Sequence, residues 1–251
     1  MRLLKTFKTF LLNTLFPPYC VSCKKEGDFF CVDCLKNLDK KKIKPIYKRI
    51  EDPDIHYLDG AIYALDYAKN PQIKAAIKQL KYKFTKDLAQ HFANMIAEKI
   101  RELNMVQGKQ IILIPVPLHK KRLNYRGFNQ AEVIARAVTS RFEDNQIVVL
   151  ELLERIRHTD QQAKLDKYER RKNLDGAFKI CDPKKSVSFL RRRESVTKNN
   201  IDSRLRGNDN SIYFLVDDVF TTGSTLESCA KTLKENDFKK VYGLVLARAF
   251  K

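Results

Sequence analysis

The chain has 251 residues and a hydrophobic fraction of 43%, which suit one large or two modest soluble domains with a sizeable core. The formal net charge of +19 lies largely in two segments: residues 1–50 carry 12 Lys and Arg against 4 Asp and Glu, and residues 184–210 carry 8 against 3. A basic terminus can bind nucleic acid or another polyanion, but a solvated basic surface explains the same charge, so composition excludes neither.

The first 16 residues predict a short amphipathic helix that packs on its own protein. Apolar residues recur there at helical spacing, and Lys5 and Lys8 lie between them. The segment is too short to span a bilayer, the lysines interrupt any signal-peptide core, and no small-residue cleavage site follows. We therefore expect a cytoplasmic protein without a membrane span, with contact to a membrane surface as the alternative.

Four cysteines form two pairs with the spacing of a metal site, Cys20-x2-Cys23-x7-Cys31-x2-Cys34. Four thiolates suit a tetrahedral Zn²⁺ ion, and four protein ligands leave no open position, so the role of the metal is structural. Disulfides or a redox pair are the alternatives; a reducing compartment disfavours the first, and no strand–helix pattern of a thioredoxin-like site supports the second. Cys229 has no partner at a ligand spacing and is expected in the core.

Alternating strands and helices follow the cysteines and a basic connector at residues 40–49. Strands are predicted at residues 57–67 around Gly60, 110–116, 147–150, 213–219 and 241–247, with a strand end at 178–180. Helices are predicted at residues 70–80, 87–103, 129–142 and 224–235, whereas the polar residues 160–173 fit either a helix or a mobile segment. Strands that alternate with helices indicate an α/β fold with a mostly parallel sheet.

Residues 184–210 break this alternation, because they are rich in Arg and Asn and have no sustained apolar period. We interpret them as a disordered insertion in a surface loop. Their sequence resembles peptides encoded by mobile palindromic elements that insert into bacterial genes. A nucleic-acid-binding arm is the alternative.

The run Ile212 to Leu226 (IYFLVDDVFTTGSTL) is the most informative stretch of the chain. An apolar strand leads into Asp217 and Asp218, a loop of Thr, Gly and Ser follows, and a helix begins at once. In open α/β sheets, ligands bind at this end of the strands. Small residues, hydroxyl groups and the N-terminus of a helix suit a phosphate monoester.

Residues 216–225 (VDDVFTTGST) resemble the phosphoribosyl pyrophosphate (PRPP) signature of type I phosphoribosyltransferases. Residues 114–130 (IPVPLHKKRLNYRGFNQ), 157–162 (RHTDQQ) and 169–178 (ERRKNLDGAF) are similar to the ComF/ComFC (GntX-like) branch, which also carries an N-terminal four-cysteine module. The resemblance covers nearly the whole chain except residues 184–210. It implies a zinc module with its connector at residues 1–48 and a phosphoribosyltransferase fold at residues 49–251.

The resemblance also implies a role for each part of the site. The ribose and its developing positive charge are assigned to Asp217 and Asp218, and the 5′-phosphate to Thr221, Thr222, Gly223, Ser224 and Thr225. Pyrophosphate and its Mg²⁺ are assigned to a loop and the basic residues after it: Pro115, Val116, Pro117, Lys121, Arg122 and Arg126. The segment 126–130 (RGFNQ) is expected to open the next helix or to lie in a closing flap, and residues 59–67 to form the hood over the acceptor.

Two functions remain open at this point. The first is an Mg²⁺-dependent phosphoribosyltransferase whose acceptor is unknown. The second is a non-catalytic protein that senses PRPP or binds single-stranded DNA in a DNA-uptake or repair assembly, with a competence helicase or DNA-processing protein as partner. The branch is associated with natural competence, and the oligomeric state is undetermined, a dimer being one option.

Overall fold

The computed structural model describes residues 17–38, 54–82, 87–103, 109–142, 147–157, 173–181 and 211–249. The predictions for the N-terminal helix, the basic connector, residues 160–172 and the insertion at 184–210 lie outside these residues.

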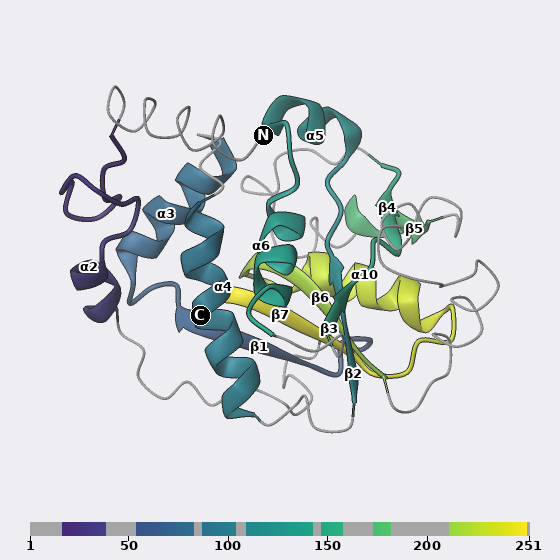
Figure 1. Ribbon diagram of the computed structural model, residues 1–251. Coiled ribbons are helices and arrows are strands. Elements are labelled where there is room, and N and C mark those ends of the chain that lie inside the picture. The colour runs from purple at the N-terminus through teal and green to yellow at the C-terminus, as the bar shows by residue number, and fades with distance from the viewer. Residues whose placement is uncertain are drawn as a thin grey trace, which may run out of the picture.

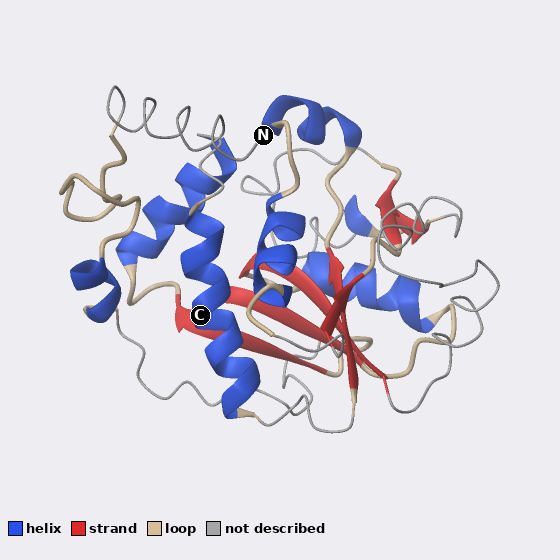
Figure 2. Ribbon diagram, in the orientation of Figure 1, coloured by secondary structure: helices blue, strands red, loops and turns tan. Residues whose placement is uncertain are grey.

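A five-stranded parallel sheet forms the centre of the molecule, with the strand order β1-β7-β6-β2-β3 (Figures 1 and 2). Its strands are β1 (Gly60–Asp66), β7 (Val241–Arg248), β6 (Ser211–Phe220), β2 (Gln110–Pro115) and β3 (Ile147–Val149). All but one residue of β1 and β2 is buried, as apolar runs in parallel sheets require. The α/β prediction is confirmed, and the sheet is consistent with a type I phosphoribosyltransferase fold.

Each face of the sheet has its own hydrophobic core. The first face packs against α3 (Pro71–Tyr82), α4 (Leu88–Glu102) and α6 (Gln130–Thr139). The second packs against α10 (Ser224–Lys234) and the antiparallel pair of β4 (Leu153–Arg155) and β5 (Phe178–Ile180). Successive residues of β6 pack alternately into the two cores, with Phe214 in the core on the first face and Tyr213 in the core on the second.

The prediction of strands on both sides of Gly60 is wrong, because β1 is one strand that begins at that residue. The preceding backbone makes no ladder; the N–H groups of His56, Tyr57 and Leu58 instead donate to the carboxylate of Glu227 at 2.6, 2.8 and 3.1 Å. The expected hood over the acceptor is also not found at residues 59–67, because β1 is a buried edge strand of the main sheet and does not line the cavity described below.

The order of the strands reverses between β2 and β6. From β2 the chain passes through α6 to β3 on one side, and the next strand of the sheet, β6, lies on the other side of β2. A crevice forms at such a switch point, at the carboxyl ends of the two strands. Here Pro115 ends β2 opposite Val216, so the acidic pair of β6 extends just past the end of its neighbour.

The cysteine segment packs on the helical layer of the first face (Figure 1). Cys20 and Phe30 are fully buried in the same core as α3 and α4. The ring of Phe30 lies edge-on to His91 of α4, whose Nε2 is 3.0 Å from Oδ1 of Asp28. None of the helices in the described part of the chain has the length and apolarity needed to cross a membrane.

Candidate phosphate and ribose site

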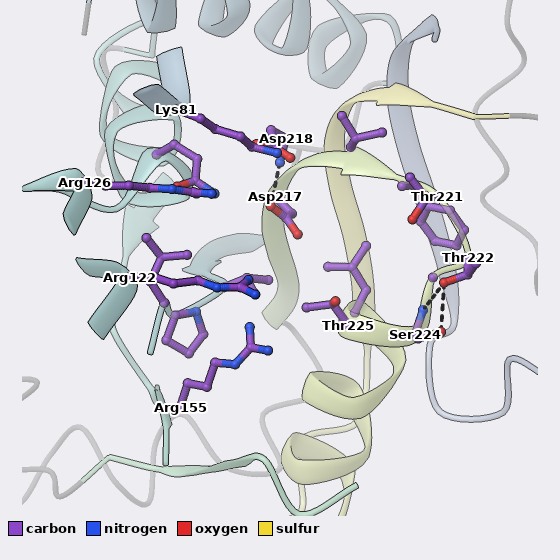
Figure 3. A pocket seen from close by; sticks show the side chains of 18 residues that line it. Lys81, Arg122, Arg126, Arg155, Asp217, Asp218, Thr221, Thr222, Ser224 and Thr225 are labelled. Carbon is purple, nitrogen blue, oxygen red and sulfur yellow. Dashed lines mark hydrogen bonds and ion pairs between the residues drawn. The ribbon is translucent and has the colours of Figure 1, made fainter. Parts of the chain in front are cut away.

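A cavity of about 460 Å³ opens at the carboxyl ends of β2 and β6 (Figure 3). It is lined by the acidic end of β6, the loop that leads into α10, the loop after β2, and four basic side chains from three further elements. Most residues that the sequence assigned to the site thus meet in one place, which the strand reversal creates.

The two acidic residues face opposite sides of the sheet, because side chains alternate along a strand. Asp218 is 3% exposed, and its Oδ2 lies 2.7 Å from Nζ of Lys81, at the end of α3 on the first face. Asp217 faces the second side, and its Oδ1 accepts a hydrogen bond from the N–H of Asp218 at 2.8 Å. Asp217 and Asp218, although adjacent in sequence, therefore lie in different surroundings on the two faces of the sheet.

The surroundings of Asp217 change its acidity. Burial and repulsion from Asp218 raise the pKa of Asp217 to about 7, against the attraction of Lys81 and Arg155. Burial acts to lower the pKa of Lys81, but Asp218 and Asp217 outweigh it and the net shift is upward. Lys81 is therefore a full cation at neutral pH, whereas Asp217 is poised to gain or lose a proton there.

The loop before α10 has the geometry of an anion cradle. Gly223 has φ +74° and begins the helix, and a Cβ at this position would lie 2.6 Å from the ring of Phe220 and 2.9 Å from Ile55. Only glycine fits both the backbone and the space. The hydroxyl groups of Thr222 and Ser224 are 2.8 Å apart. All five residues from Thr221 to Thr225 line the cavity, at a helix N-terminus that favours anions.

The predicted pyrophosphate residues separate into two groups. Val116, Pro117, Arg122 and Arg126 line the cavity. Pro115 is the last residue of β2, and Lys121 is an exposed residue of α5 (Lys120–Arg126); neither lines the cavity. His119 precedes α5 and caps it, because its side chain accepts a hydrogen bond from the N–H of Lys121 at 3.3 Å.

The segment 126–130 joins two helices at the rim of the cavity rather than forming one helix start. Gly127 ends α5 with φ +70°, and Asn129 begins α6 by accepting from the N–H of Ala131 at 3.1 Å. The side-chain amide of Asn129 also donates to the carbonyl of Val116 at 3.0 Å. Gln130 accepts from Arg126 at 3.0 Å. The segment therefore ties the loop after β2 and one cavity arginine to the start of α6.

Two cations in the cavity wall were missed by the sequence analysis, namely Lys81 and Arg155. Arg155 is only 8% exposed, its guanidinium lies 5.3 Å from the ring of Phe178, and Figure 3 shows it directed into the cavity beside Arg122. Burial and repulsion from Arg122 lower its pKa. One signal was available, since Arg155 shares a strand face with the buried Leu153; nothing distinguished Lys81 from other helix lysines.

The four cysteines of the N-terminal segment form one cluster. Their sulfur atoms lie within 4.8 Å of one another, and the Sγ atoms of Cys23 and Cys31 are 3.6 Å apart. Tetrahedral Zn²⁺ with Zn–S bonds of about 2.3 Å requires sulfur atoms about 3.8 Å apart, so the cluster could hold such an ion. Burial acts to raise the pKa of the Cys20 thiol, but backbone hydrogen bonds from its neighbours outweigh it and lower the pKa to about 6.

Neither remaining cysteine in the described residues belongs to this cluster. Cys229 is fully buried in the second core, as expected, and burial raises its pKa well above the usual value. It is therefore an inert core thiol rather than a metal ligand or nucleophile.

Comparison with known proteins gives a consistent set of relatives, although no family model matches the chain. The chain is 29% identical to competence protein F of Haemophilus influenzae over 242 residues, 92% of this chain and 85% of that protein. It is 28% identical to DNA utilization protein YhgH of Escherichia coli K12 over 188 residues, 73% and 69% of the two chains. It is 25% identical to competence protein ComFC of Bacillus subtilis over 169 residues, 67% and 56% of the two chains. With its N-terminal four-cysteine cluster, the chain is thus a homologue of the competence protein F, ComFC and YhgH proteins.

Proposed function

We propose that the chain binds PRPP, or a ribose 5-phosphate ligand, in the cavity between β2 and β6 and transfers the phosphoribosyl group to an acceptor. One observation carries this proposal. The acidic pair of β6 and the loop that leads through Gly223 into α10 line the same cavity, at the point where the strand order reverses. A ligand that contacts both must present hydroxyl groups to the carboxylates and an anion to the helix N-terminus, and a sugar phosphate does so.

The loop at residues 221–225 would hold the 5′-phosphate through backbone N–H groups and hydroxyls. Hydroxyl groups are well suited there because Thr222 and Ser224 already share a hydrogen bond that a phosphate oxygen can join or replace. The pinned conformation of Gly223 means that these donors are arranged before the ligand arrives, which lowers the entropic cost of binding.

The carboxylates of Asp217 and Asp218 would accept hydrogen bonds from the 2′- and 3′-hydroxyls of the ribose. In the transfer step, the bond from C1 to the pyrophosphate oxygen breaks and pyrophosphate leaves with the bonding electrons. The acceptor nitrogen bonds to C1, and the proton of that nitrogen passes to solvent. Positive charge develops on the ring as the leaving group departs, as in glycoside chemistry. A fixed carboxylate beside the ring stabilises that charge more in the transition state than in the ground state.

The pyrophosphate would lie against the loop after β2, within reach of the guanidinium groups of Arg122 and Arg126. Guanidinium groups suit phosphate because they offer paired donors in a plane. The hydrogen bond that Arg126 donates to Gln130 fixes the arginine in the cavity wall. When bound, Mg²⁺ would supply further charge neutralisation to the phosphates of the leaving group.

The cysteine cluster would hold a structural Zn²⁺ ion, since all four ligand positions are occupied by thiolates. The names of the relatives refer to competence and to DNA utilization, and we infer that this chain also acts in the uptake or use of DNA, in the cytoplasm. The acceptor is then sought among nucleobases and amines available during that process.

Calorimetric titration with PRPP in Mg²⁺ tests the binding, followed by an assay for pyrophosphate release with nucleobases and amines as acceptors. The wild type should bind PRPP, and the Asp217→Asn/Asp218→Asn double variant should bind it at least about tenfold more weakly, equivalent to about 1.4 kcal/mol. Equal binding by the two proteins would overturn the site. Binding without release for every acceptor would overturn catalysis and favour a sensor.

A second function, binding of single-stranded DNA, is favoured by the surface beside the cavity. Tyr125 of α5 is 76% exposed, and Leu123 and Tyr82 are also exposed. Lys120 and Lys121 flank them on the same rim. Aromatic rings among cations suit base stacking and backbone contacts. Fluorescence anisotropy with labelled oligothymidine should show weaker binding for Tyr125→Ala than for Tyr57→Ala, an exposed tyrosine outside this rim; equal affinities would rule this function out.

A further inference from the structure

The ion pair between Lys81 and Asp218 supports an inference about how cations are used in the site. Asp218 is almost fully buried, and a buried carboxylate is stable as an anion only with a close counter-charge. Nζ of Lys81 provides that charge at 2.7 Å from Oδ2. The acid therefore has a cation supplied by the protein before any ligand or metal arrives.

Lys81 is held in this position by the fold. The buried residues of α3, which include Ile77 and Leu80, anchor the helix in the first core. The next residue, Tyr82, has Arg126 above its ring at 5.1 Å and in contact with its hydroxyl at 3.4 Å. In the last turn of α3, Lys81 therefore lines the cavity itself, and Tyr82 contacts the cavity residue Arg126. Figure 3 shows Lys81 reaching across to Asp218.

A divalent ion cannot share the same oxygen with this ammonium group at low cost. Mg²⁺ coordinates carboxylate oxygens at about 2.1 Å, so an ion on Oδ2 would lie no more than about 4.8 Å from Nζ of Lys81. Two cations repel strongly at that separation in a poorly hydrated site. Lys81 and a metal ion are therefore competitors for Asp218.

We propose that Lys81 replaces a divalent metal ion at the ribose end of the site, so that the sugar-phosphate half of the ligand binds without metal and Mg²⁺ serves only the pyrophosphate half. This proposal rests on the proposed function for its ligand, but not for its cation chemistry. Lys81 acts as a positioning residue: it holds Asp218 charged and oriented toward the ribose hydroxyls.

Binding of Mn²⁺ alone, measured by electron paramagnetic resonance, tests the competition without any sugar phosphate. Lys81→Met should bind Mn²⁺ about tenfold more tightly than the wild type, because Oδ2 of Asp218 is released. Lys78→Met, which removes an exposed lysine of the same helix, should match the wild type. Adding Asp218→Asn to Lys81→Met should abolish the gain. An unchanged Mn²⁺ affinity in Lys81→Met would overturn the proposal.

Titration with ribose 5-phosphate and with PRPP, in EDTA and in Mg²⁺, tests whether Mg²⁺ is needed only for the pyrophosphate half of the ligand. In the wild type, Mg²⁺ should change the affinity for ribose 5-phosphate less than twofold and strengthen that for PRPP. In Lys81→Met, binding of ribose 5-phosphate should become dependent on Mg²⁺, whereas Lys81→Arg, which keeps the charge, should not. If Lys81→Met does not fold, Lys81→Met/Asp218→Asn, which removes both charges, should bind ribose 5-phosphate weakly and without response to Mg²⁺.

The titrations distinguish failure of the role proposed for Lys81 from failure of the proposed function. A wild type that requires Mg²⁺ for ribose 5-phosphate overturns the role of Lys81 and leaves the proposed function intact. A wild type that binds neither ligand under any condition overturns the proposed function, and the Mn²⁺ measurement then decides the cation competition by itself.

Discussion

The side-chain amide of Asn129 donates a hydrogen bond to the carbonyl of Val116 at 3.0 Å, while its oxygen accepts from the N–H of Ala131. One residue thus begins α6 and fixes the loop after β2. We predict that Asn129→Asp, which keeps a good helix cap but cannot donate, retains thermal stability and loses about tenfold in pyrophosphate affinity. Asn129→Ala should lose the affinity and about 1 kcal/mol of unfolding free energy as well. Calorimetry with pyrophosphate and thermal melts measure both; full affinity in Asn129→Asp would contradict the role of the contact.

Gly223 offers a test of the phosphate loop with an internal control. We predict that Gly223→Ala weakens binding of ribose 5-phosphate at least about tenfold, since the added Cβ collides with Phe220 and Ile55. Gly176 has a similar φ of +63°, but nothing lies within 4 Å of its Cβ position. Gly176→Ala should therefore cost about 1 kcal/mol of stability through backbone strain alone and leave affinity unchanged. Equal affinities for the two variants would show that the loop tolerates the side chain.

Glu227 anchors the backbone before β1 by accepting from three consecutive N–H groups at 3.1 Å or less. Because hydrogen bonds to a charged acceptor are stronger than neutral ones, Glu227→Gln should lower the unfolding free energy by about 2 kcal/mol. Glu235→Gln, at the exposed end of the same helix, should change it by less than about 0.5 kcal/mol. Urea denaturation measures the unfolding free energy of both variants. Similar losses in the two would show that Glu227 does not anchor the backbone before β1.

The pKa of Asp217 predicts how stability depends on pH. Its pKa rises from 3.8 to about 7 on folding, so between these values the folded state holds a proton that the unfolded state has released. Stability from this group is therefore full below pH 3.8 and is lost as pH rises through 7. Asp217→Asn should be more stable than the wild type at pH 8 by roughly 1–3 kcal/mol and should lose this advantage at pH 4. A constant difference between their melting temperatures from pH 4 to pH 8 would contradict the shift.

Removal of metal tests the cysteine cluster. Freshly reduced protein should contain about one equivalent of zinc, and chelation should lower the melting temperature because structural zinc sites contribute directly to folding. Cys23→Ser should abolish zinc binding, whereas Cys181→Ser, outside the cluster, should retain it. Less than about half an equivalent in the wild type would count against zinc.

The sequence predicted the parts of the site that are contiguous. The apolar run before Asp217 and the small residues after it indicate a strand, a turn and a helix start, and the structure places them so. The partners of this segment were not predictable in the same way. Lys81 reaches Asp218 only because α3 packs on the first face, and Glu227 is buried only because its acceptors meet backbone from residues 56–58. Such pairings depend on tertiary packing, which no local pattern records.

The burial of Cys20 and Phe30 in the core of α3 and α4 has a consequence for how the chain can be divided. Deletion of the residues before β1 would expose an apolar face of α3 and α4, and α3 is the helix that carries Lys81. Such a fragment would be prone to self-association, even though it retained every residue of the cavity. The cysteine segment therefore shields the apolar surface of α3 and α4 from solvent, and the ligand site is best produced and studied with this segment present.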